Sequence, residues 1–168
     1  MTEVIVRRAT SDDIDTIVAL WRKLMDLHQE VEPTYFTMSA GADDSFRSYI
    51  AKCLDDPDRM VAVAVRGGEP IGYIHVARSQ RPPVMAPQPI QGAIQECCVS
   101  ERARRAGVGR MLVAEAIKWC RERSLPHVVV GYTLANPMSG PFWNAMGFRP
   151  LEVTALLPVE TKGEHSQS

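Results

Sequence analysis

The sequence predicts a mixed α/β fold in which helices pack on the faces of one central sheet. Two features lead to this prediction: the predicted elements follow the order β, α, α, β, β, β, α, β, α, β, and no repeat or long linker divides them. With 168 residues, 45% hydrophobic and 23% charged, the chain suits one globular domain. We expect residues 1–160 to form that domain and residues 161–168 to be a flexible polar tail.

The first part of the chain predicts a strand followed by two helices. Residues 3–9 begin with consecutive β-formers, and Thr10 with Asp13 resembles a capping box. The helix that follows has one apolar face at steps of three and four residues, made of Ile14, Ile17, Trp21, Leu24 and His28. A second helix is indicated by Phe46, Tyr49, Ile50, Cys53 and Leu54, and Pro57 ends it.

The middle of the chain predicts three strands. Residues 60–65 and 71–76 are apolar and β-branched on either side of Gly67 and Gly68, which is typical of a hairpin. Residues 81–89 contain four prolines, so we expect a loop there. Extended structure resumes over residues 90–99.

The last part predicts a helix over residues 107–123 with one buried side, and Pro126 after it. An apolar strand over 127–134, a short helix over about 137–146 and a final strand over 148–157 complete the fold.

Charge and cysteine content narrow the classes of partner and compartment. The formal net charge is −1, so the protein as a whole has no reason to bind nucleic acid or an anionic membrane. The four cysteines form no C-x-x-C pair, which favours reduced thiols, and we predict no metal site. The sequence shows neither a signal-like amino terminus nor an apolar run long enough to span a membrane, so we expect a cytoplasmic protein.

A basic, glycine-containing segment carries the clearest chemical signal. Residues 101–123 hold seven basic and three acidic residues, which indicates either an anion site or a solvated basic face. A strand ends at Val99, and Gly107 and Gly109 open a helix whose first N–H groups have no internal partner. A diphosphate suits such N–H groups, and Arg104, Arg105 and Arg110 add positive charge.

The same segment resembles the R/Q-x-x-G-x-G/A signature of Gcn5-related N-acetyltransferases. The residues that match are Arg104, Arg105, Ala106, Gly107, Val108 and Gly109. Downstream, Asn136 to Phe148 is similar to the family's segment N-x-x-A-x-x-F-Y-x-x-x-G-F, with Ser139 for Ala and Trp143 for Tyr. The Walker and dinucleotide-binding glycine patterns do not fit.

The resemblance implies a mixed, mostly antiparallel central sheet with a splayed pair of middle strands, flanked by four helices. It also implies that acetyl-CoA binds along residues 104–110 and that its pantetheine arm adds to the main chain at Cys98 and Val99 like a strand. Asn136 would contact the cofactor, or simply cap a helix. Phe142 would pack along the pantetheine, or belong to the core.

Acetyl transfer to an amine needs a base, and Glu96 is the candidate, with a solvated strand carboxylate as the alternative. Alternation places Glu96 on the face opposite Cys97 and Val99. Trp143 replaces the tyrosine that many relatives use to protonate the leaving thiolate, which leaves water or Tyr132 for that task. We do not favour an acyl-cysteine route through Cys97 or Cys98.

The predicted function is that of an acetyl-CoA-dependent N-acetyltransferase. The acceptor would be a primary amine of a small molecule or a peptide, attacking directly in a ternary complex. The alternative is a non-catalytic acyl-CoA-binding domain of the same fold, which the missing tyrosine motivates. A homodimer is left open. His28 lies on the apolar face of the first helix, where we expect a half-buried structural histidine rather than a catalytic one.

Overall fold

The computed structural model describes residues 3–81 and 90–159. Its sheet has five strands in sequence order: β1 (Val4–Arg8), β2 (Arg59–Arg66), β3 (Glu69–Gln80), β4 (Ile90–Val99) and β5 (Val128–Val130). Strands β1 to β4 pair antiparallel, and β5 pairs parallel with β4. The predicted mixed, mostly antiparallel sheet is confirmed.

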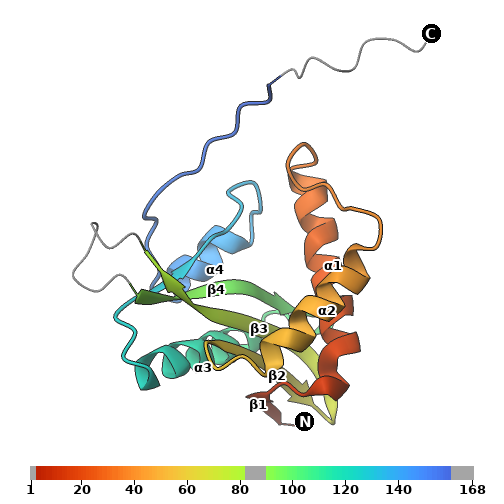
Figure 1. Cartoon of the computed structure of the whole chain (residues 1–168), viewed down its shortest axis with the longest axis vertical. Coiled ribbons are helices and arrows are strands. Elements are labelled where there is room, and N and C mark those ends of the chain that lie inside the picture. Colours follow the sequence, from red (N-terminus) through yellow and green to blue (C-terminus); the bar gives the residue numbers. More distant parts are fainter. Residues whose placement is uncertain (1–2, 82–89, 160–168) are drawn as a thin grey trace.

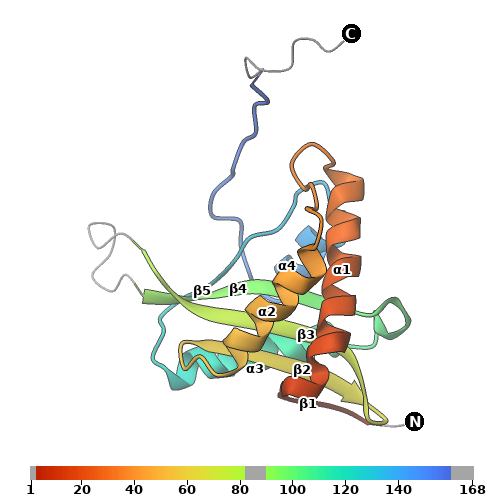
Figure 2. The ribbon, with the colours of Figure 1, turned by 45° about the vertical axis from the view of Figure 1, so that its right-hand side comes forward.

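Helices cover both faces of the sheet, as Figures 1 and 2 show. On one face lie α1 (Ile14–Val31) and α2 (Ala42–Leu54), and on the other lies α3 (Val108–Glu122). The short helix α4 (Ser139–Ala145) follows β5, and two 3₁₀ turns, η1 (Ser11–Asp13) and η3 (Glu101–Ala103), precede α1 and α3. None of the helices in the described part of the chain is both long and apolar enough to cross a bilayer.

Alternation along the strands divides the core in two. Side chains such as Ala62, Ile74 and Leu112 form one cluster between the sheet and α3. Side chains such as Val63, Tyr73 and Ile17 form the other, between the sheet and the α1–α2 pair. Successive strand residues therefore serve opposite cores, which explains why β2 and β3 read as continuous apolar runs.

The middle strands part beyond a short region of pairing. β4 and β5 are paired only where Gly92, Ala93 and Ile94 face Val128, Val129 and Val130. β4 then continues to Val99 with β3 as its partner, while the chain after Val130 leaves the strand conformation. The predicted splayed pair is thus present, and residues 95–99 of β4 have no strand beside them on the β5 side.

A β-bulge interrupts β4 close to its open edge. His75 faces Glu96 and Val76 faces Ile94, so Gln95 is an extra residue on β4. The extra residue reverses the alternation. Ile94 can then join the α3-side core while Glu96 remains on the α1–α2 face beside His75.

The amino-terminal entry to α1 agrees with the sequence. The backbone N–H and the hydroxyl of Thr10 both donate to the Asp13 carboxylate, at 2.8 and 3.2 Å. Arg7 donates to the same carboxylate at 2.7 and 2.9 Å. The predicted capping box is confirmed, with an ion pair to β1 added to it.

The end of the fold differs from the prediction. The strand predicted over 127–134 is reduced to β5, and the strand predicted over 148–157 is wrong, since residues 148–159 form no helix or strand. Pro150 and Pro158 remove donors from this segment, and its side chains at Leu151, Val153 and Leu157 are exposed. The segment leaves the body of the molecule in Figure 1. Most of the predicted 81–89 loop and the whole 161–168 tail lie outside the described residues.

Candidate active site

The glycine turn, residues 104–109, links the end of β4 to α3. Arg105 has φ 61° and Gly107 has φ 80°, so two left-handed residues reverse the chain within four positions. A side chain at position 107 would meet no atom within 4 Å, so conformation rather than crowding requires glycine there. Helix α3 begins at Val108 with Gly107 as its N-cap.

The amino terminus of α3 has the properties of an anion site. Gly107 has no side chain to cap the helix, and the first intrahelical bond is the one donated by the Met111 N–H to the Gly107 carbonyl. No acidic residue lies in the first turn, and the exposed Arg105 and Arg110 flank it. Arg102 instead forms an ion pair with Glu69, so its charge is already paired.

Arg104 ties the glycine turn to the open end of β4. Its Nε donates to the Val99 carbonyl at 3.3 Å, while the residue as a whole stays exposed. The turn and the edge predicted to bind the pantetheine are therefore adjacent. A ligand that bound at both would bridge from the helix N-terminus to β4.

Close packing explains Gly109. A Cβ built there would lie 3.1 Å from two atoms of the Phe142 ring and 3.8 Å from Val99 Cγ2. Phe142 is half-buried, and its ring meets Trp143 edge-on with centroids 4.9 Å apart. Gly109 of the first motif half and Phe142 of the second therefore lie close together beside Val99, at the end of β4.

The cysteines at the end of β4 are not nucleophiles. Burial raises the pKa of Cys97 to about 12 and that of Cys98 to about 11, so both thiols are protonated at neutral pH. The Cys98 thiol donates to the Leu20 carbonyl at 3.3 Å. An acyl-cysteine route would need a thiolate, which the raised pKa values of Cys97 and Cys98 disfavour at neutral pH.

Asn136 and the aromatic residues near it have structural contacts. The Asn136 side chain is buried, and its Oδ1 accepts the Met138 N–H at 3.0 Å ahead of α4. This bond closes an Asx turn ahead of α4, whose N-cap is Met138. Trp143 is 7% exposed within the α3-side core, and the partly buried Tyr132 packs against the same cluster.

Glu96 stands at the end of a buried chain of hydrogen bonds. Its Oε2 lies 2.9 Å from His75 Nδ1, and His75 Nε2 lies 3.3 Å from Arg59 Nη1. The His75 side chain is fully buried, whereas the Glu96 side chain keeps 16% exposure. Glu96 is therefore a partly accessible carboxylate held from behind, not a solvated strand side chain.

Arg59 is fixed by several contacts. It donates to Asp56 Oδ2 at 3.1 Å and to the Tyr49 hydroxyl at 2.9 Å, and its guanidinium lies 5.5 Å from the Tyr49 ring centre. Tyr49 in turn meets the His75 ring edge-on with centroids 5.7 Å apart. We call Asp56, Arg59, His75 and Glu96 the positioning chain.

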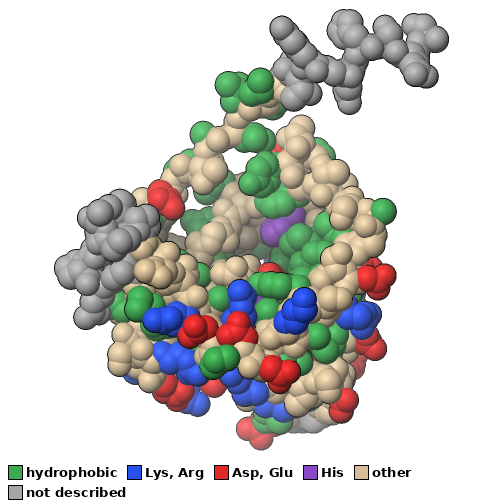
Figure 3. Space-filling view, in the orientation of Figure 1, with side chains coloured by type: hydrophobic (Ala, Val, Ile, Leu, Met, Phe, Trp, Pro, Cys, Tyr) green, Lys and Arg blue, Asp and Glu red, His purple; other side chains and the backbone are tan. Residues whose placement is uncertain are grey.

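A hollow opens on the face seen in Figure 3, with hydrophobic and histidine side chains in it. Aromatic pairs lie on this side of the sheet: Trp21 of α1 stacks on Phe46 of α2 with centroids 4.2 Å apart, and His28 of α1 stacks on Phe36 of the α1–α2 link at 4.8 Å. Burial lowers the pKa of His28, so it is neutral at pH 7, and its Nδ1 has no hydrogen-bond partner among the described residues. The expectation of a half-buried His28 agrees with this setting.

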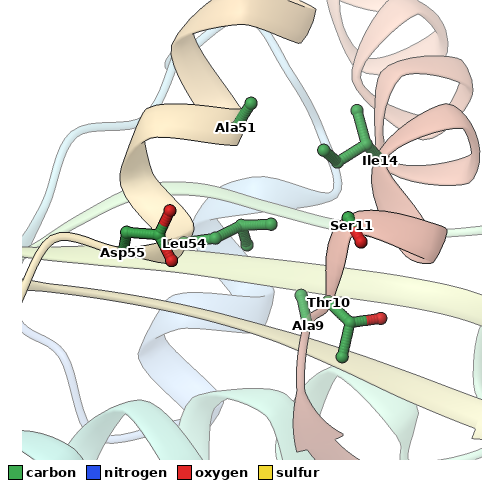
Figure 4. Close-up of a pocket in the computed structure, with 7 residues that line it drawn as sticks. All are labelled: Ala9, Thr10, Ser11, Ile14, Ala51, Leu54 and Asp55. Atoms are coloured by element: carbon green, nitrogen blue, oxygen red, sulfur yellow. The ribbon is translucent and has the colours of Figure 1, made fainter.

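A separate depression of about 440 Å³ lies between the start of α1 and the end of α2 (Figure 4). It is lined by Ala9, Thr10, Ser11, Ile14, Ala51, Leu54 and Asp55. None of these is a predicted site residue. Elsewhere in the described ranges, no three His, Cys, Asp or Glu side chains gather as metal ligands do.

The structure brings most of the predicted residues to one end of β4. Cys98, Val99, the glycine turn and Phe142 meet there, and Glu96 lies on the same strand. Sequence reasoning missed His75, Arg59 and Tyr49. The signal available for His75 was a single histidine in the otherwise apolar stretch 71–77 of β3, and its partner depended on the β3–β4 register.

β4 has an open edge and leads into an uncapped helix N-terminus flanked by arginines, and Glu96 lies on the same strand, an arrangement that suits an acyltransferase. The sequence matches the model of the Acetyltransferase (GNAT) family over residues 21–148. The chain belongs to that family. No curated protein sequence matches it.

Solved structures agree with this assignment. A mutant of the BH1408 protein from Bacillus halodurans has a TM-score of 0.85 at 21% identity, covering 93% of this chain and 99% of that one. A GCN5-related N-acetyltransferase from Ralstonia eutropha has a TM-score of 0.74 at 24% identity, covering 94% and 99%. The aminoglycoside N-acetyltransferase AAC(6')-Iy, solved in complex with CoA, has a TM-score of 0.74 at 14% identity, covering 96% and 97%. At these identities the likeness shows the fold.

Proposed function

We propose that the protein is an acetyl-CoA-dependent N-acetyltransferase that acts on a primary amine of a small molecule or peptide. The observation that carries the proposal is the joining, at one end of β4, of an uncapped helix N-terminus with an accessible carboxylate. One feature suits a diphosphate and the other suits a protonated amine. The solved CoA complex of a protein with the same fold supports the choice of cofactor.

The residues present fit acetyl-CoA on structural grounds. The N–H groups of Val108, Gly109 and Arg110 have no acceptor within α3. These N–H groups would hold the diphosphate, and Arg105 and Arg110 would neutralise it. When bound, acetyl-CoA supplies the acetyl group as a thioester.

We assign proton removal to Glu96. An alkylammonium ion is not a nucleophile until it loses a proton, and Glu96 can accept that proton directly or through one water. Within the described residues, His75 contacts only Oε2, so Oε1 has no protein partner and can face the amine. The amine nitrogen would then bond to the acetyl carbon as the carbon–sulfur bond breaks. The second proton of the nitrogen would pass to water, and water would return a proton to the thiolate.

A direct test is acetyl transfer by the purified chain to a panel of amines, with CoA release and acetylated product both measured. The panel should include alkyl diamines, amino acids, peptides with free amino termini and aminoglycosides. Transfer to at least one of them is expected. CoA release without acetylated product would mean thioester hydrolysis and would count against the assignment.

The presence of Trp143 favours one alternative, a domain that binds acyl-CoA without turnover. The buried Trp143 leaves no tyrosine at the position where many relatives have one. Trp143→Tyr distinguishes the two. If water already protonates the thiolate, kcat should not rise and no new basic limb should enter the pH profile, whereas a manyfold rise would favour the binding-only function.

A further inference from the structure

His75 has a role that its position in an apolar strand did not suggest. Its ring is fully buried, yet both nitrogens have polar neighbours: Glu96 Oε2 at 2.9 Å from Nδ1 and Arg59 Nη1 at 3.3 Å from Nε2. Carboxylate oxygens accept hydrogen bonds and guanidinium nitrogens only donate them. The two neighbours thus place opposite requirements on the two ring nitrogens.

These requirements fix the proton on the ring. Arg59 cannot accept, so its contact with Nε2 needs a lone pair on Nε2, and the proton of the neutral ring must be on Nδ1. A doubly protonated ring would direct an Nε2–H at a guanidinium N–H. It would also bury a second positive charge beside Arg59, which the fully buried position disfavours.

The rest of the setting holds Arg59 in place. Among the described residues, the charged or titratable groups that contact the ring are Tyr49 from α2, Arg59 from β2 and Glu96 from β4. Asp56 and the Tyr49 hydroxyl both accept from Arg59, so the guanidinium cannot turn away without losing two hydrogen bonds.

We propose that Arg59 sets the Nδ1–H tautomer of His75, and that His75 in this form holds one oxygen of the Glu96 carboxylate so that the other faces the acceptor amine. His75 and Arg59 are positioning residues, since His75 is fully buried and Arg59 acts on Glu96 only through His75. Arg59 blocks Nε2, so the chain orients the base and does not conduct a proton outward. The proposal rests on the proposed function, because orientation of Glu96 matters to turnover only if Glu96 is the base.

The first test needs no variant and no activity. Long-range proton–nitrogen NMR of the full chain, with labelled histidine, reports the protonation of each His75 nitrogen. Nε2 should show the shift of an unprotonated nitrogen that accepts a hydrogen bond. An Nε2–H tautomer would overturn the proposal.

The second test compares two amides at the same position. In His75→Asn the amide nitrogen can take the place of Nδ1 and still donate to Glu96, whereas in His75→Gln it reaches the place of Nε2 near Arg59. We expect His75→Asn to keep most of kcat and His75→Gln to lose about tenfold or more, with KM for acetyl-CoA unchanged in both. A merely structural histidine would not separate the two amides.

His127→Asn is the matched control, because His127 is exposed and outside the site. Equal kcat values for His75→Asn and His75→Gln, with both proteins folded, would contradict the positioning role. If the wild-type chain acetylates no amine, the proposed function fails and the catalytic part of this proposal fails with it. The NMR result still decides the tautomer in that case.

Discussion

The two regions that meet on β4 are built in different ways. The glycine turn depends on backbone: left-handed residues, an uncapped helix start and exposed arginines, all within seven consecutive positions. The positioning chain depends on side chains from β2, β3 and β4 and on Asp56 ahead of β2. The first is local in sequence and solvent-exposed, whereas the second is dispersed in sequence and passes through the fully buried His75. A short sequence motif can therefore encode the turn that we propose binds the cofactor. The position of the Glu96 carboxylate depends instead on contacts between several strands of the sheet.

The largest effect should come from the accessible end of the positioning chain. Glu96→Gln keeps the shape and still accepts from His75, but it cannot take a proton at neutral pH. We expect kcat to fall by roughly 100-fold or more, with little change in acetyl-CoA affinity. Steady-state kinetics measures the change in kcat, and calorimetric titration measures the acetyl-CoA affinity. An unaltered pH–rate profile would mean that Glu96 is not the base.

The second effect tests the glycine turn. Gly109→Asp would place a carboxylate at the anion site, and its Cβ would press on the Phe142 ring. We expect CoA affinity to fall by about tenfold or more, which corresponds to ~1.4 kcal/mol. Gly109→Ala has the same steric conflict without the charge and is the matched control. Equal losses in the two variants would assign the effect to packing against Phe142.

At Arg105 we expect a smaller loss of CoA affinity, together with equal or higher thermal stability. This residue is left-handed at φ 61°, a conformation that glycine adopts without strain. Arg105→Gly should leave the melting temperature unchanged or raised while weakening CoA binding severalfold through loss of charge. Arg102→Gln, whose arginine pairs with Glu69, should change CoA affinity little. Tighter CoA binding by Arg105→Gly would show that the arginine does not face the anion.

The smallest effect on activity is expected at Asp13, which lies outside both regions and tests stability alone. The hydrogen bond from Arg7 is the main cause that lowers the pKa of Asp13, which also caps the entry to α1. A lowered carboxyl pKa stabilises the fold above the ordinary value of 3.8, and this stability is lost as the pH falls below it. Asp13→Asn should cost about 0.5–2 kcal/mol at neutral pH.

Chemical denaturation between pH 7 and pH 3 measures this contribution. The difference in unfolding free energy between wild type and Asp13→Asn should shrink below about pH 4. Transfer kinetics at pH 7 should stay at the wild-type level, because Asp13 contacts neither the glycine turn nor the positioning chain. A difference independent of pH would show that the charge of Asp13 contributes nothing.

Errors in the predicted fold occur where local composition and tertiary pairing disagree. Residues 148–157 have a strand-like composition, yet they pair with no strand among the described residues, and after Phe148 their large apolar side chains lie exposed. Strand formation needs a neighbouring edge, and β5 is only three residues long. The bulge at Gln95 could not be foreseen either, because it is a property of the β3–β4 register.

The sequence by itself determined the order of nearly all helices and strands, the glycine turn and its arginines, and the position of Glu96 on the face of β4 opposite Cys97 and Val99. These are local properties: periodicity, turn chemistry and motif spacing act over a few residues. Only the tertiary structure decided that Gly109 and Phe142 touch, and that His75 and Arg59 stand behind Glu96. Such contacts depend on strand register and sheet alternation, which bring together residues far apart in the chain and which no short stretch of sequence encodes.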